Sequence, residues 1–120
     1  MFRQIYDDVN TFGQNELGGM DRLAFTEADN KAHSYLKGLA EEVGFQTKTD
    51  GAGNLWITAR GSEDGNPDYP VMYVGSHMDT VPDGGRYDGT LGVLAAFHAM
   101  LLLQQYAPKR TVTLLVLRCE

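Results

Sequence analysis

Apolar residues recur at helical spacing in two segments of the first half of the chain. In residues 2–14 they lie three or four positions apart, at Phe2, Ile5, Tyr6, Val9 and Phe12, which predicts a first helix. A second helix is predicted to begin after Thr26, an N-cap followed by acidic residues, and to end at Gly44, a left-handed cap. One apolar stripe runs along it, formed by Ala28, Ala32, Tyr35, Leu36, Leu39, Ala40 and Val43.

Four segments have the patterns of β-strands. Residues 45–49 alternate in polarity, which predicts a half-buried strand, and Asp50–Gly53 is a predicted turn into a second strand at Leu55–Ala59. The segments Val71–Gly75 and Thr111–Leu117 are apolar with little alternation. That pattern predicts two further strands with both sheet faces covered.

A mostly apolar helix is predicted at Leu91–Gln105, between the last two strands. Strand, helix and strand in this order form a βαβ unit, in which the strands are parallel and the crossover is right-handed. We therefore predict an α/β fold with a mixed, largely parallel sheet flanked by helices. The polar loop at residues 61–70 is too short for a domain linker, so residues 1–120 are predicted to be one unit.

Composition and charge narrow the classes of function. The 120 residues are 42% hydrophobic and 22% charged, and the net charge of −6 comes without a basic cluster. This argues against a nucleic-acid partner. The single Cys119 excludes an internal disulfide and suits the cytoplasm. No secretory signal is visible, and the apolar run 91–103 is shorter than the roughly 20 residues that a bilayer requires, so no membrane partner is expected.

Residues that carry chemistry gather after the strand Val71–Gly75. His77 and Asp79 are followed by a turn rich in glycine and by Asp88, which opens the predicted helix. The second parallel strand is followed by Glu120. Since the carboxyl ends of parallel strands meet at one edge of a sheet, we expect these groups to converge there, where open α/β sheets place their active sites. Imidazole and carboxylate are ligands for zinc, manganese and similar ions, so a hydrolytic metal site is the leading hypothesis.

Each of these residues also has a structural interpretation. His77 with Asp79 is either a metal ligand whose second ring nitrogen is held by a carboxylate, or an incidental histidine at a capped strand end. Asp88 is either a bridging metal ligand or the N-cap of the following helix. Glu120 is either a general base that activates water or an acid in a place where charge costs little.

Other chemistry-bearing residues are predicted to be structural. We place His33 on the polar side of its helix and His98 within an apolar helix, and Cys119 is expected to be a small buried side chain. Trp56 and Tyr73 are assigned to the core rather than to a substrate site. The glycines fit neither a dinucleotide fingerprint nor a phosphate-binding loop.

The segment Gly75-Ser76-His77-Met78-Asp79-Thr80-Val81-Pro82, followed by Gly84-Gly85-Arg86-Tyr87-Asp88-Gly89, resembles one branch of a known superfamily. This is the amidase branch of the two-metal aminoacylase and carboxypeptidase superfamily, which contains N-carbamoyl-L-amino-acid hydrolases, β-ureidopropionases and allantoate amidohydrolases. Arg22-Leu23-Ala24-Phe25-Thr26 and Asp50 with Gly53-Asn54-Leu55 are further matches. The resemblance covers essentially the whole chain.

The resemblance implies a role for each residue. His77 would bind one of two divalent ions (zinc, manganese, cobalt or nickel), Asp88 would bridge both, Asp79 would orient His77, and Glu120 would be the general base. The implied reaction is hydrolysis of a linear amide or ureido C–N bond, with N-carbamoyl-L-amino acids as the first choice of substrate and allantoate as the second. A related aminoacylase or peptidase, or a non-catalytic binding module, are the alternatives.

The resemblance also implies that 120 residues are an N-terminal portion of a longer catalytic domain. The family's other metal-binding histidines and its dimerisation domain have no counterpart in the chain. The complete enzyme is expected to be a homodimer. The 120-residue chain is expected to be inactive, to bind metal poorly, and to expose apolar surface that favours self-association.

Overall fold

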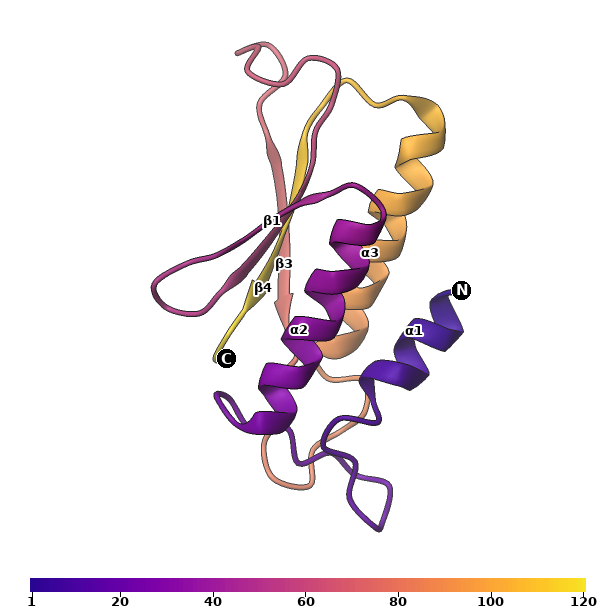
Figure 1. Cartoon of the computed structure of the whole chain (residues 1–120), viewed down its shortest axis with the longest axis vertical. Helices are drawn as coiled ribbons and strands as arrows, with labels where there is room; N and C mark the ends of the chain where they lie inside the picture. The colour runs from indigo at the N-terminus through magenta and orange to yellow at the C-terminus, as the bar shows by residue number, and fades with distance from the viewer.

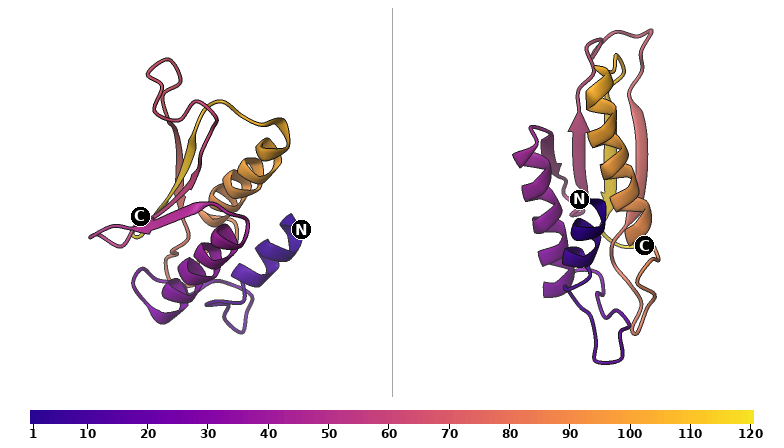
Figure 2. Two further views of the ribbon diagram at one scale, coloured as in Figure 1. Left: turned by 45° about the horizontal axis from the view of Figure 1, so that its top comes forward. Right: turned by 90° about the vertical axis from the view of Figure 1, so that its right-hand side faces the viewer.

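Three helices lie on one side of a four-stranded sheet in the computed structural model, which describes residues 1–120 (Figure 1). The helices are α1 (Phe2–Val9), α2 (Glu27–Glu42) and α3 (Thr90–Leu103), and α3 continues into the short 3-10 helix η1 (Gln104–Tyr106). The strands are β1 (Gln46–Thr49), β2 (Leu55–Ala59), β3 (Met72–His77) and β4 (Val112–Leu117). Both views in Figure 2 keep the helices on the same side of the sheet.

The sheet has the strand order β1-β2-β4-β3. β3 and β4 are parallel and joined by α3, while β1 pairs with β2 and β2 with β4 in antiparallel register. The predicted βαβ unit and the predicted mixed α/β fold are confirmed. The sheet is not largely parallel as predicted, because β3 and β4 form its one parallel pair. In the parallel pair His77 lies opposite Leu117, so both strands end at the same edge.

Two helix boundaries show which local signals were informative. Thr26 caps α2, since its side chain accepts from the backbone of Asp29, and Gly44 follows the helix with φ 87°. Both had been predicted. The first helix ends at Val9 rather than at residue 14, because the chain turns through Asn10 and reaches Gly13 with φ 91°. Phe12 still packs against the core from this turn. Its position three residues after Val9 therefore fitted the helical pattern although the helix had ended.

The core lies between the helices and one face of the sheet. Strand residues Leu55, Ile57, Leu114 and Val116 are fully or almost fully buried there. They meet helix residues that are equally buried, namely Ala32, Leu36, Ala40, Val93, Leu94, Phe97 and Met100. Alternation along β2 and β4 thus selects the residues that face the helices.

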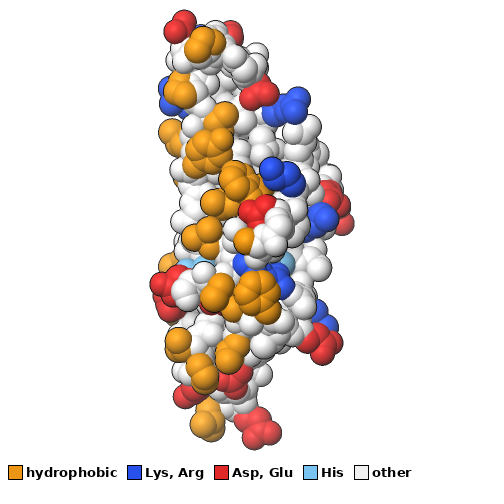
Figure 3. All heavy atoms as spheres, turned by 90° about the vertical axis from the view of Figure 1, so that its left-hand side faces the viewer, with side chains coloured by type: hydrophobic (Ala, Val, Ile, Leu, Met, Phe, Trp, Pro, Cys, Tyr) orange, Lys and Arg blue, Asp and Glu red, His pale blue; other side chains and the backbone are white.

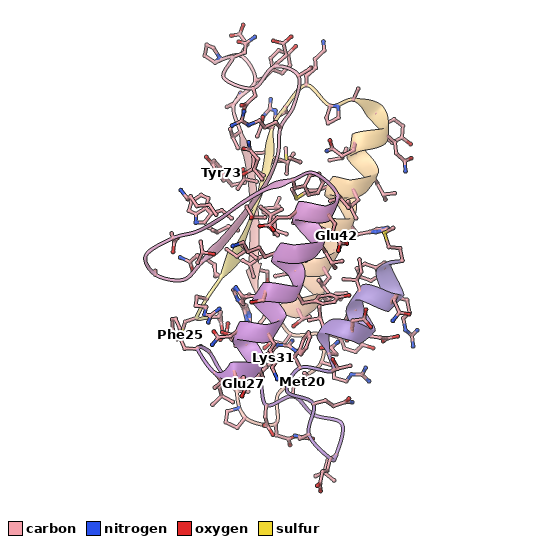
Figure 4. The ribbon with its side chains drawn as sticks, in the orientation of Figure 1. Met20, Phe25, Glu27, Lys31, Glu42 and Tyr73 are labelled. Atoms are coloured by element: carbon pink, nitrogen blue, oxygen red, sulfur yellow. The ribbon has the colours of Figure 1, made fainter.

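The other face of the sheet is open. Tyr73 is 63% exposed and points away from the helices (Figure 4). The prediction that both faces of β3 are covered is wrong, as is the assignment of Tyr73 to the core. Figure 3 shows a band of hydrophobic side chains along the side of the molecule opposite the helices. The expected exposure of apolar surface is therefore present.

The helices are too short or too polar for a bilayer. None of them is a candidate for a membrane span.

Candidate active site

A cavity of about 330 Å³ lies at the edge where β3 and β4 end. Its walls include all four residues singled out from the sequence, His77, Asp79, Asp88 and Glu120. The remaining lining comes from the segments before α2 and after β3, namely Leu23, Ala24, Thr80, Val81 and Pro82. His77, Asp88 and Glu120, which lie apart in the chain, thus share one cavity, as the βαβ pattern predicted.

His77 is held in one orientation. Its Nδ1 lies 3.0 Å from the backbone oxygen of Asp79 and 3.4 Å from the Asp79 carboxylate. An Nδ1–H that donates to the main-chain oxygen leaves the Nε2 lone pair free. Nε2 lies 4.0 Å from Oε2 of Glu120. The ring therefore presents its basic nitrogen towards a second acidic side chain, which is the arrangement of a metal-binding histidine.

Asp79 supports this site with three different contacts. The sequence predicted that its carboxylate would hold His77, but the nearest acceptor is its main-chain oxygen. The reason is that β3 extends to His77 and ends there, so Asp79 lies in the following turn rather than in the strand. One carboxylate oxygen, Oδ2, accepts from the backbone N–H of Glu120 at 3.3 Å. Oδ1 is buried without a hydrogen-bond partner, which leaves an acceptor for the imidazole when the ring shifts by a few tenths of an ångström.

Asp88 is exposed in the loop before α3. The N-cap of this helix is Gly89, and no side chain caps it. The structural interpretation of Asp88 as an N-cap is therefore wrong. Its main-chain oxygen accepts from Thr90 at 2.7 Å, which fixes the backbone and leaves the carboxylate available at the cavity wall.

The loop approaches His77 so closely at Gly89 that no side chain fits. Gly89 has φ 68°, and a Cβ atom there would lie 2.5 Å from Cε1 and 2.6 Å from Nδ1 of His77. We expect Gly89→Ala to displace the ring and break its contact with Asp79, at a cost of about 1–3 kcal/mol in folding free energy from the backbone conformation alone. NMR of the imidazole nitrogens measures the first effect and urea unfolding the second. Gly85→Ala is the matched control, since nothing lies near a Cβ atom at Gly85.

Arg22 links the segments that border the cavity. Its side chain is fully buried and donates to the main-chain oxygens of Val9, Phe12 and Met78 and to the hydroxyl of Thr90, at 2.8–3.0 Å. These acceptors belong to the end of α1, the turn after β3 and the start of α3. Burial lowers the pKa of Arg22, and the nearby carboxylates of Asp29 and Asp79 oppose that shift. In the sequence, Arg22 stood out only as part of the motif at residues 22–26, and nothing there indicated this role.

A second buried polar group lies beside the cavity. Asp29 is fully buried, accepts from the backbone of Phe25 at 3.0 Å, and pairs with Arg118 at 3.3 Å. Burial is the main cause that raises the pKa of Asp29. His33 lies 3.6 Å from the same carboxylate and is 7% exposed. His33 lies among polar groups, as predicted, but it is buried rather than exposed, because this side of α2 packs against Arg118.

His33 should make stability depend on pH. Burial first, and then the charges of Arg118 and Arg22, lower its pKa from 6.5 to about 4. Between these pH values His33 is protonated in the unfolded chain and neutral in the folded chain. The free energy of unfolding therefore falls as the pH drops from 6.5 to 4, and the contribution of His33 does not change further below pH 4. The shift corresponds to about 3 kcal/mol. Urea unfolding from pH 7 to 4 should show this loss, and His33→Gln should reduce it, while the control His98→Gln should keep it.

The donor set fits part of a metal site. An imidazole with a free Nε2 and two carboxylates border one cavity, which is suitable chemistry for a divalent ion. No group of three or more histidine, cysteine, aspartate or glutamate side chains is close enough together to hold an ion. Cys119 is a free cysteine and is exposed, whereas it was predicted to be a small buried side chain.

No protein-family profile matches the chain. Individual relatives do match it over most of its length. It is 32% identical to a ureidoglycolate hydrolase of Oryza sativa over 98% of the chain, 35% identical to an N-carbamoyl-L-amino acid amidohydrolase of Geobacillus stearothermophilus over 82%, and 38% identical to an allantoate amidohydrolase of Bacillus subtilis over 91%. The matched part is 24%, 24% and 26% of these enzymes, so the chain spans about a quarter of their length.

A solved structure agrees with these relatives. The chain superposes on a hydantoinase/carbamoylase family amidase from Burkholderia ambifaria with a TM-score of 0.88 and 26% identity, over 96% of the chain and 28% of that protein. The resemblance seen in the motifs is thereby confirmed in sequence and in fold.

Proposed function

From this homology to ureido-cleaving amidohydrolases, we propose that residues 1–120 supply one part of the active site of a metal-dependent hydrolase of linear ureido or amide C–N bonds. The observation that carries the proposal is the shared cavity of His77, Asp79, Asp88 and Glu120. His77, Asp79 and Asp88 belong to the motifs that resemble the amidases.

Each side chain has a proposed task. His77 is a metal ligand through Nε2, and Asp79 keeps the proton on Nδ1 and the ring in place. Asp88 is the second ligand and is exposed enough to reach two ions. Glu120 is the general base: its side chain is 66% exposed and lies beside His77, so it can take a proton from an attacking water and pass it to the leaving nitrogen.

The metal supplies the electrophilic part of the chemistry. Two divalent ions would polarise the carbonyl of the substrate and make a nearby water more acidic. The two proposed ligands are too few for two ions, so further ligands must come from polypeptide outside these residues. We assign no single metal among zinc, manganese, cobalt and nickel.

The proposed substrates share one chemical feature. N-Carbamoyl-L-amino acids, allantoate and ureidoglycolate all carry a ureido group on the carbon next to a carboxylate. We place N-carbamoyl-L-amino acids first and allantoate second, and the match to a plant enzyme adds ureidoglycolate to the set. A homodimeric assembly and a cytoplasmic location complete the proposal and rest on the resemblance alone.

A chimaera tests the proposal. Residues 1–120 replace the matching segment of the Geobacillus stearothermophilus enzyme, with which they share 35% identity. We expect ammonia release from ureido substrates that stops when a chelator removes the metal and returns when metal is added. N-Acetyl amino acids and dipeptides are the comparison substrates. A folded, metal-loaded chimaera that cleaves only these, or nothing, would contradict the proposal.

A further inference from the structure

The turn between β1 and β2 reaches across the sheet to the end of β4. Oδ1 of Asn54 accepts from the backbone N–H of Arg118 at 2.8 Å. The regular pairing of β4 with β3 stops at Leu117, so this bond fixes the next residue of the strand. Glu120 follows only two positions later.

Asp50 makes this turn rigid. Its carboxylate accepts from the backbone N–H groups of Ala52 and Asn54 at 3.0 and 2.9 Å, and from the side chains of Asn54 and Trp56 at 3.1 and 2.9 Å. The bonds to Trp56 and Asn54 lower its pKa to about 2, so the carboxylate stays charged and bonded at neutral pH. The amide of Asn54 therefore has one orientation: its nitrogen faces Asp50 and its oxygen faces Arg118.

The side chain of Arg118 is placed by an ion pair and by an aromatic ring. Nε lies 3.3 Å from Oδ2 of the buried Asp29, and the guanidinium lies over the ring of Phe25 at 5.1 Å. Phe25 has the unusual φ of 64°, and its N–H donates to the same Asp29. Gly53 leaves room, since a Cβ atom there would lie 3.2 Å from Cγ of Arg118. The β1–β2 turn, the loop before α2 and α2 itself thus converge on one arginine.

We propose that Asn54 and Asp29 are positioning residues for Glu120, acting through Arg118; the inference rests on the proposed role of Glu120 as general base. Beyond Arg118, Glu120 has one further anchor, the N–H bond to Asp79 at 3.3 Å. With the strand end fixed at both points, the carboxylate of Glu120 lies beside Nε2 of His77. Without Asn54, the backbone of residues 118–120 would keep only the anchor at Asp79.

The 120-residue chain itself tests the placement. In ¹⁵N-labelled protein, Asn54→Ala should speed amide exchange of Arg118 and Glu120 by about five- to tenfold, the equivalent of one lost hydrogen bond. It should also remove the nuclear Overhauser effect between the side chains of His77 and Glu120. Asn66→Ala is the matched control, since Asn66 bonds only within the loop before β3 and should change neither signal.

Two outcomes would overturn the inference. One is an unchanged His77–Glu120 contact and unchanged exchange in Asn54→Ala, and the other is an equal effect of Asn66→Ala, which would mean general loosening. If Asn54→Ala does not fold, Asn54→Ser replaces it, because serine suits the turn but is too short to reach the Arg118 amide. The amide exchange of Arg118 and Glu120 and the His77–Glu120 contact are then measured in Asn54→Ser.

The chimaera separates positioning from mere stability. There Asn54→Ala should lower kcat by about tenfold or more with KM little changed, since the base and not the binding of substrate is displaced. A change in KM alone, with kcat unchanged, would overturn the assignment. An inactive parent chimaera would refute the proposed function, while the exchange and contact measurements would still decide whether Asn54 places Glu120.

Discussion

Replacing Arg22 by methionine should lower the free energy of unfolding by about 3–5 kcal/mol, or prevent folding. The substitution keeps the length of the side chain and removes the guanidinium. The main-chain oxygens of Phe12 and Met78 and the hydroxyl of Thr90 then lose this donor, while the oxygen of Val9 keeps the N–H of Phe12. A buried acceptor left without a partner costs about 1–3 kcal/mol. Asp29 and Asp79 also lose a compensating positive charge.

Urea unfolding, followed by circular dichroism, measures this effect. The control is Arg3→Met, since Arg3 is exposed and pairs only with Asp7 one helical turn away. It should change stability by less than about 0.5 kcal/mol. If Arg22→Met remained within 1 kcal/mol of the unsubstituted chain, by the same scale of single-mutation effects, Arg22 would not hold the cavity together.

Removing Asp88 should have the largest effect on catalysis. In an active chimaera, Asp88→Ala should lower kcat/KM by at least about 100-fold and reduce the bound metal, because a ligand to both ions is lost. Asp79→Asn should be milder, with a metal affinity about 10–100-fold weaker, since Asp79 is proposed to orient a ligand and not to bind the ion itself. Metal analysis and ammonia release measure both results.

Asp83→Ala is the control for this comparison. Asp83 lies in the same loop, but it bonds to Asn15 and to Asp21 and does not line the cavity. Its loss should leave metal content unchanged. Full metal content and turnover in Asp88→Ala would contradict the bridging role.

Local sequence signals predicted much of this fold for physical reasons. Thr26 and Gly44 define the ends of α2 through side-chain and backbone geometry that is local to each residue. The apolar runs around β3 and β4 with a helix between them admit essentially one connection, the right-handed crossover. That connection alone brought His77, Asp88 and Glu120 to one edge.

What escaped prediction depends on tertiary contacts. His33 has polar neighbours in sequence, and only the packing of Arg118 against α2 buries it. Tyr73 is exposed because one face of the sheet is open, and an apolar strand pattern does not predict an open face. The role of Arg22 depends on acceptors from three separate segments, which no periodicity could reveal.

We propose that the carboxyl edge of β3 and β4 binds a divalent ion at a site built around His77. Substoichiometric Mn²⁺ added to ¹⁵N-labelled chain tests it directly, because the paramagnetic ion broadens nearby amide signals even when binding is weak. We predict that the signals around His77, Asp88 and Glu120 broaden first, and that His77→Ala abolishes this preference. Broadening that is strongest at other acidic residues, or that is the same in His77→Ala, would contradict the account.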